Sequence, residues 1–290
     1  MKTILFALAV SVGAGAGPGI DPAWAQQTFS GRLSDSMCGA SHTAKATDGR
    51  LSERQCIFEC IKALATFVLV DENQQVIPIA NQDAAGLPLY AGRPVRITGE
   101  RKGGAIFVSK VEAIPAHLHL GHVVTNWRDT PGTRGFLPVA VDEARTAMTH
   151  AKLASTAADL DGIKLHTAHV VHALDPTAEP KGPGAGYGVK KAAAGALQHL
   201  EFAIKSEGAT ASVNTHAAQI FAPLKDVIQR TDQALAVAQK VRAATDAAEA
   251  ATLAGELSAL IAEISGKDLL QAQTHMEMML KAEGIFGAPR

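Results

Sequence analysis

The sequence lacks the motifs that mark the commonest catalytic and cofactor sites. It has no Gly-x-Ser-x-Gly nucleophile elbow, no His-Glu-x-x-His zinc motif and no Cys-x-x-Cys-His sequence for covalent haem. The glycines of Gly182-x-Gly184-x-Gly186-x-Gly188 are not preceded by a strand pattern, as a dinucleotide-binding fingerprint requires. We interpret this run as a tight loop between two helices. The sequence therefore predicts no catalytic residue.

An excess of one charge is also absent. Lysine and arginine number 27, aspartate and glutamate number 28, and the formal net charge is −1. The two signs alternate along the chain without a basic stripe, so we expect no nucleic-acid partner. Beyond the N-terminus no apolar run is long enough to span a bilayer, so we expect no membrane insertion.

The N-terminus has the pattern of a secretory signal peptide. Lys2 provides the positive charge, residues 4–12 the apolar stretch, and Ala23-Trp24-Ala25 a cleavage site between small residues. We predict a signal peptide at residues 1–25 and a mature chain that starts at Gln26. The expected location is the periplasm or the outside of the cell.

Cysteine is scarce, with only Cys38, Cys56 and Cys60 in the chain. An oxidising compartment would allow one disulfide and one remaining thiol. The alternative is a metal site, because Cys38-x3-His42 and Cys56-x3-Cys60 offer three sulfur ligands and one nitrogen for zinc. Of the two, we favour a disulfide between Cys38 and one of the other cysteines.

Residues 26–114 predict a small β-rich domain. Short strand patterns alternate with turns, and Lys102-Gly103-Gly104 is typical of a hairpin turn. This pattern favours a small barrel of the OB type. The block Ser34-Asp35-Ser36-Met37-Cys38-Gly39, followed by Cys56-x3-Cys60 and the strand at residues 67–71, resembles small exported OB-like domains of unknown function. The resemblance covers roughly a third of the chain and implies an exported β-barrel module without a defined activity.

The second part of the chain predicts an all-α antiparallel bundle, so the predicted fold class is α+β with two domains. Residues 115–135 contain His117, His119 and His122 and are predicted to be a linker, in which alternate side chains would point the same way. The bundle is predicted to occupy residues 136–290. Its helices are expected at residues 137–156, 160–174, 189–206, 211–244, 247–264 and 268–283.

Histidine is abundant: ten of the eleven lie between His117 and His275. In the helix pattern at residues 160–174, three of them follow each other in steps of three residues. At 100° per residue, His166 lies on the apolar stripe, His169 at its edge and His172 nearer the polar side. A buried imidazole needs a hydrogen bond or a ligand.

Four other predicted helices also place a histidine on the apolar stripe, and Glu143 lies about 20° from His150 on the same helix wheel. Side chains on facing helices build ion sites in the cores of bundles. We therefore predict one metal site in the bundle core. Its predicted ligands are His150, His166, His169, His199, His216, His275 and Glu143.

Imidazole ligands with few carboxylates suit copper, nickel or zinc. The helical half is also similar in composition to small histidine-rich periplasmic metal-binding bundles, although no defined motif is shared. The leading hypothesis is an exported, non-enzymatic protein that binds a transition metal for storage, buffering or delivery. One alternative is an electron carrier that holds haem b non-covalently between two histidines. Another is a structural or interaction module without a cofactor.

Overall fold

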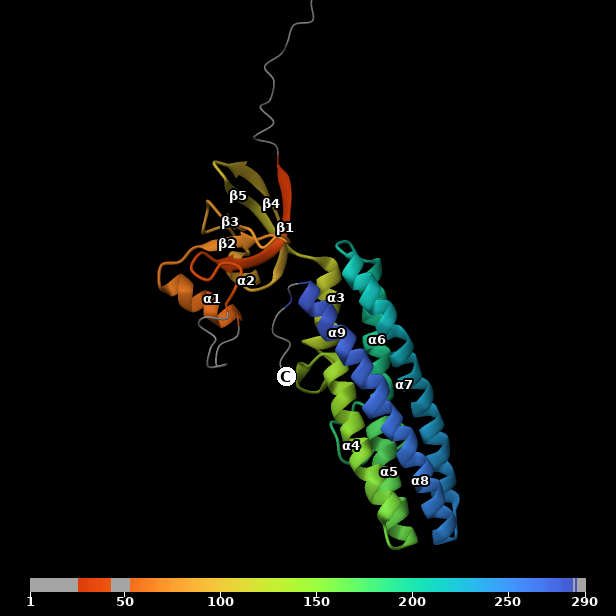
Figure 1. Ribbon diagram of the computed structural model, residues 1–290. Coiled ribbons are helices and arrows are strands. Elements are labelled where there is room, and N and C mark those ends of the chain that lie inside the picture. Colours follow the sequence, from red (N-terminus) through yellow and green to blue (C-terminus); the bar gives the residue numbers. More distant parts are fainter. Residues whose placement is uncertain (1–25, 43–52, 284, 286–290) are drawn as a thin grey trace, which may run out of the picture.

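The computed structural model describes residues 26–42, 53–283 and 285. The predicted signal peptide at residues 1–25 lies outside the described residues. A β-rich part comes first, and a long bundle of helices follows it (Figure 1).

The β-rich part is one antiparallel sheet with the strand order β3-β2-β1-β4-β5. Ile57 of the first helix and Leu87 of the short second helix share a hydrophobic core with sheet residues such as Leu33. The predicted strand segments are confirmed. The elements are β1 (Gln27–Asp35), α1 (Glu53–Lys62), β2 (Phe67–Val70), β3 (Val76–Pro78), α2 (Leu87–Tyr90), β4 (Pro94–Lys102) and β5 (Ala105–Ala113).

The predicted OB-like barrel is wrong, because the sheet is open. Within the described residues, the edge strands β3 and β5 are joined in the sheet ladder only by an isolated bridge between Ile79 and Ile106. Strand β3 has three residues, which is too short for a continuous ladder with β5. Alternating hydrophobicity indicates which face of a strand is buried, but it does not determine whether the two edges of a sheet meet.

The helical part confirms the predicted bundle. The predicted break at residues 265–267 is a π-helical turn, Ile264–Asp268, that connects two helices directly. Within the described residues, no helix combines the length and apolar character needed to cross a bilayer. The bundle consists of α4 (Phe136–Thr156), α5 (Leu160–Leu174), α6 (Val189–Lys205), α7 (Ala211–Ala243), α8 (Ala247–Glu263) and α9 (Leu269–Ala282).

Side-chain caps set the start of several of these helices. Asp159 accepts a hydrogen bond from the backbone N–H of Gly162, and Thr210 accepts one from Val213. Asp246 caps α8 in the same way, through the N–H groups of Ala248 and Glu249. These caps satisfy backbone donors that have no partner inside the helix, and two of the capped helices, α5 and α7, carry histidines.

Part of the predicted linker is a helix, α3 (Pro115–Val124). Pro115 occupies its first turn, where a missing N–H costs nothing. Leu120, Val123 and Val124 are buried in the same core as the bundle helices, and α3 packs against α6. The backbone N–H of Ala116 also donates to the carbonyl of Glu207, 3.2 Å away. The histidines of this segment therefore have fixed positions against α6.

Candidate metal centres

Three histidines meet where α3 packs on α6. His119 and His122 lie one helical turn apart on α3, and His199 comes from α6. The Nδ1 atom of His199 is 3.2 Å from Nδ1 of His119 and 3.3 Å from Nδ1 of His122. We call these residues the α3–α6 cluster. Sequence reasoning placed His199 in a different group and His119 in a flexible segment.

A second trio repeats this construction between α4 and α5. His166 and His169 lie one turn apart on α5, and His150 comes from α4. The Nδ1 atom of His150 is 3.2 Å from Nδ1 of His166 and 3.3 Å from Nδ1 of His169. We call this trio the α4–α5 cluster. In both clusters the three ligand atoms all lie within 4.8 Å of one another, a spacing that one metal ion can bridge.

The nitrogen spacings match one coordination geometry. A tetrahedral zinc ion with bonds of 2.0–2.1 Å holds its nitrogen ligands about 3.3–3.4 Å apart. Adjacent ligands of a square-planar ion would be about 2.8–3.0 Å apart, and opposite ligands about 4 Å apart. Two of the three spacings in each cluster, 3.2 and 3.3 Å, are therefore close to those around a tetrahedral ion.

The electrostatics of the α3–α6 cluster favour the form of histidine that binds metal. Burial and the charges of His122 and His119 lower the pKa of His199 to about 4. Burial also lowers the pKa of His119, and burial together with His119 lowers that of His122. All three rings are therefore neutral at pH 7, with one N–H and one lone pair each. With the protons on Nε2, all three Nδ1 atoms can give an electron pair to one metal ion.

Two histidines of the α4–α5 cluster, His150 and His169, have the same electrostatic character. Burial lowers the pKa of His150, and the neighbouring His169 and His166 lower it further. Burial is also the largest cause of the lowered pKa of His169, to which His166 and His172 add and which Glu179 opposes. Neutral imidazole is the form that binds metal, so these rings need not lose a proton first.

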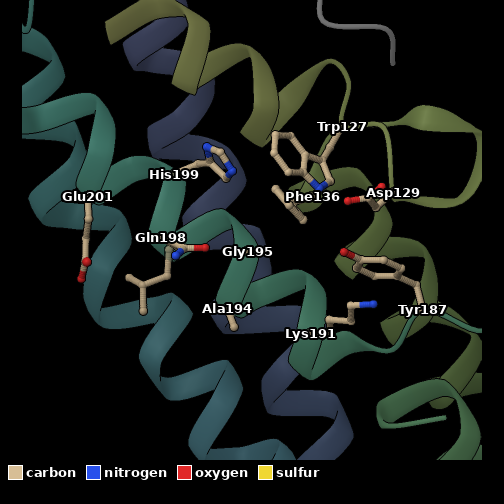
Figure 2. Close-up of a pocket in the computed structure, with 11 residues that line it drawn as sticks. Trp127, Asp129, Phe136, Tyr187, Lys191, Ala194, Gly195, Gln198, His199 and Glu201 are labelled. Atoms are coloured by element: carbon tan, nitrogen blue, oxygen red, sulfur yellow. The ribbon is translucent and has the colours of Figure 1, made fainter. Parts of the chain in front are cut away.

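An aromatic wall and a cavity adjoin the α3–α6 cluster (Figure 2). The ring of Phe136 stacks on His199 with centroids 5.4 Å apart, and Trp127 lies 4.8 Å from both His199 and His122. The cavity has a volume of about 550 Å³, and its lining includes His199, Trp127 and Phe136. A small molecule therefore has space beside the cluster.

The prediction of one shared core site is wrong. Phe136, which stacks on His199, lies fourteen residues before His150 on α4, so the two clusters are about 20 Å apart along that helix. His216 of α7 and His275 of α9 form a separate pair with ring centroids 5.8 Å apart. A helix wheel shows which side of its own helix a residue occupies, but not which neighbouring helix that side contacts.

Glu143 is a loop anchor, and the prediction that it joins the histidines as a ligand is wrong. Its Oε1 atom accepts hydrogen bonds from the backbone N–H groups of Tyr187 (2.8 Å) and Gly188 (3.2 Å). A Cβ atom on Gly184, whose φ is +122°, would lie 2.5 Å from Glu143 Oε2. The glycine-rich loop is thus held against α4 by a buried carboxylate.

Two other histidines are held by protein groups. His172 is buried, against the expectation that it lies nearer the polar side, and its Nδ1 atom is 2.7 Å from the carbonyl oxygen of Glu179. The Nε2 atom of His117 is 2.9 Å from Oε2 of Glu283. Burial opposes ionisation of Glu283, but hydrogen bonds from His117 and Thr210 outweigh it and lower its pKa.

Replacing Glu143 with alanine should reduce the free energy of unfolding by about 2–4 kcal/mol, because two buried backbone donors lose a charged acceptor. Urea unfolding at pH 7.5 without metal measures this. Asp142→Ala is a matched control on the same helix, since Asp142 makes only exposed ion pairs with Arg134 and Arg145; we expect about 1 kcal/mol or less for it. Equal effects of the two variants would contradict the anchor.

The cysteines also converge. Cys38, Cys56 and His42 form one group of ligand atoms within 4.8 Å, and Asp35, Cys38 and Cys60 form another. None of the three cysteines is in a disulfide in the structure, so the favoured pairing stays a prediction.

Comparisons with protein families, with curated proteins and with solved structures found no match to this chain. The geometry of the clusters therefore carries the functional conclusion. Both clusters contain a His-x-x-His pair, His119 with His122 and His166 with His169, but His169 and His172 have the same spacing, so this signal alone does not identify the ligands.

Proposed function

We propose that the chain binds two tetrahedral transition-metal ions, one in the α3–α6 cluster and one in the α4–α5 cluster, and that zinc is the preferred ion. The spacing of the Nδ1 atoms carries this proposal, because in each cluster two spacings are close to the edge of a tetrahedron around one ion and all three ligand atoms lie within 4.8 Å of one another. Histidine ligands without carboxylates also select against calcium and magnesium.

Each cluster supplies three ligands and leaves a fourth position for water or an exchangeable ligand. Within the described residues, neither cluster includes a fourth histidine, cysteine, aspartate or glutamate at this spacing. Structural zinc sites are closed by four protein ligands, whereas three-ligand sites stay open to exchange. An open site suits uptake and release, so we propose that the protein stores, buffers or delivers the metal.

The haem alternative receives less support from the same distances. A haem iron held by two histidines needs their nitrogens on opposite sides of the ring, about 4 Å apart. The paired Nδ1 atoms are 3.2 and 3.3 Å apart in both clusters. This arrangement suits adjacent ligands of a bare ion.

A zinc titration tests the proposal. The metal-free protein should bind two more zinc ions per chain than the double variant His150→Ala/His199→Ala, measured by calorimetry and by elemental analysis after dialysis. The matched control is His172→Ala, which removes a buried histidine held by Glu179 and should bind as many ions as the parent. Equal zinc content in the parent and the double variant would overturn the proposal.

A further inference from the structure

A different group of soft ligands lies in the β-rich part. Cys56 and Cys60 lie one turn apart on α1 and are both buried, and Cys38 follows the end of β1. The Sγ atom of Cys38 is 3.6 Å from Sγ of Cys60 and 3.9 Å from Sγ of Cys56. A tetrahedral zinc ion with Zn–S bonds of 2.3 Å holds sulfur atoms about 3.8 Å apart.

His42 offers a lone pair to the same place. Ser34 Oγ donates its only proton to the carbonyl oxygen of Gly39 (2.6 Å), so it must accept at 2.9 Å from Nε2 of His42. The neutral ring therefore carries its proton on Nε2 and a lone pair on Nδ1. That Nδ1 atom is buried and has no hydrogen-bond partner. A ligand nitrogen of His42 lies within 4.8 Å of the sulfurs of Cys38 and Cys56.

We propose that Cys38, Cys56, Cys60 and His42 hold a zinc ion in a closed structural site, separate from the two clusters of the bundle. The site ties the turn after β1 to α1. It has four protein ligands, so it has no open position for exchange. Its expected role is to stabilise the fold of the β-rich part rather than to carry metal.

The carboxylate of Asp35, which lies beside the ligands, supports a structural metal site. Oδ1 of Asp35 accepts hydrogen bonds from the N–H groups of Met37 (2.9 Å) and Cys38 (2.8 Å), and so shapes the turn that carries the first ligand. Oδ2 of Asp35 is buried without a hydrogen-bond partner and lies 3.7 Å from Nδ1 of His42. The negative charge of Asp35 beside the ligands favours a cation at this place.

The alternative to a zinc site is a disulfide between two of the same thiols. It requires two sulfurs to approach to about 2.05 Å, so Cys38 Sγ would move by about 1.5 Å toward one neighbour. A disulfide would leave the lone pair of His42 Nδ1 unused. Cys38 belongs to both groups of ligand atoms, so one metal ion bound to it can take His42 and Cys56 from one group and Cys60 from the other.

Cobalt(II) titration of the reduced full-length protein under anaerobic conditions tests the site. Only thiolate ligands give sulfur-to-cobalt charge-transfer absorption, so the all-histidine clusters do not contribute to this signal. We expect the band to saturate at one cobalt ion per chain and to be absent in Cys38→Ser and Cys56→Ser. Ser34→Ala, which removes the partner of His42 Nε2, should weaken binding about 10–100-fold. The control His199→Ala should keep the full band.

If a cysteine variant fails to fold, alkylation of the wild type gives the same answer. Zinc should slow the reaction of all three thiols at least tenfold. No charge-transfer band and no protection in the reduced protein would overturn this site. A single reactive thiol in the unfolded, unreduced protein would also overturn it, in favour of the disulfide. None of these outcomes affects the zinc difference measured between the parent and the histidine double variant.

Discussion

Zinc at a hundredfold excess over its dissociation constant should raise the melting temperature of the parent at pH 7.5 by about 10–20 °C more than that of His150→Ala/His199→Ala. Each site that binds only the folded chain adds about 2.7 kcal/mol at this excess, so two sites add about 5 kcal/mol. For a domain of this size, 1 kcal/mol corresponds to about 2–4 °C. Calorimetric melts with zinc and with a chelator give the difference.

The double variant is the right reference because it removes one ligand from each cluster and leaves the cysteine group intact. His172→Ala should lower the melting temperature through the loss of a buried hydrogen bond but should keep the zinc response of the parent. A parent and a double variant that respond equally to zinc would show that the histidine clusters do not bind it.

The α3–α6 cluster should hold zinc at pH values where free imidazole would release it. Three unperturbed histidines with a pKa of about 6.5 would lose about a thousandfold in affinity by pH 5.5, because each is then about nine-tenths protonated. The pKa of His199 is lowered to about 4 by burial and by its neighbours, and those of His119 and His122 are lowered too. The loss by pH 5.5 should therefore be much smaller than a thousandfold, and release should come as the pH falls toward 4.

The same shift determines how the metal-free protein responds to acid. The unfolded chain takes up protons below about pH 6.5, whereas folded His199 does so only near pH 4. The unfolded state therefore binds more protons between these values, and stability falls as the pH falls from 6.5 to 4. Zinc affinity by competition titration, together with metal-free unfolding at pH 7.5, 5.5 and 4, measures both effects. A thousandfold loss of affinity by pH 5.5 would contradict the burial of this cluster.

Local patterns predicted much of the helical part. The helix at residues 160–174 has the predicted bounds, because Asp159 caps its start and Pro176 follows its end. His166 and His169 do belong to a group of potential metal ligands, as predicted. Their partner could not be derived, since a periodic pattern does not say that α4 packs against this side of α5.

The linker prediction failed for a reason that can be read in the sequence. Proline and glycine favour a loop when they are considered alone, yet Pro115 begins α3 and Gly121 lies within it. Leu120, Val123 and Val124 follow the spacing of a buried helix face, which is the stronger signal. In the helix, His119 lies with His122 at three residues' distance, rather than with His117 at two.

In the β-rich part, local sequence patterns predict the strands and the turn but not the arrangement of the sheet. The alternation in β4 and the hairpin glycines at 103 and 104 define strands and a turn, and both are present. The open sheet depends on how far the edge strand β3 extends beside β5, which is a long-range property. The convergence of Cys38 with α1 is likewise a result of the fold and not of spacing in the sequence.

Anomalous diffraction at the zinc edge from crystals of the zinc-loaded protein tests the central claim most directly. We predict one peak about 2.0–2.1 Å from the Nδ1 atoms of His119, His122 and His199, and a second at the same distances from those of His150, His166 and His169. Each ion should have one further ligand from solvent. A zinc-loaded crystal with no peak at either trio of histidines would contradict the account.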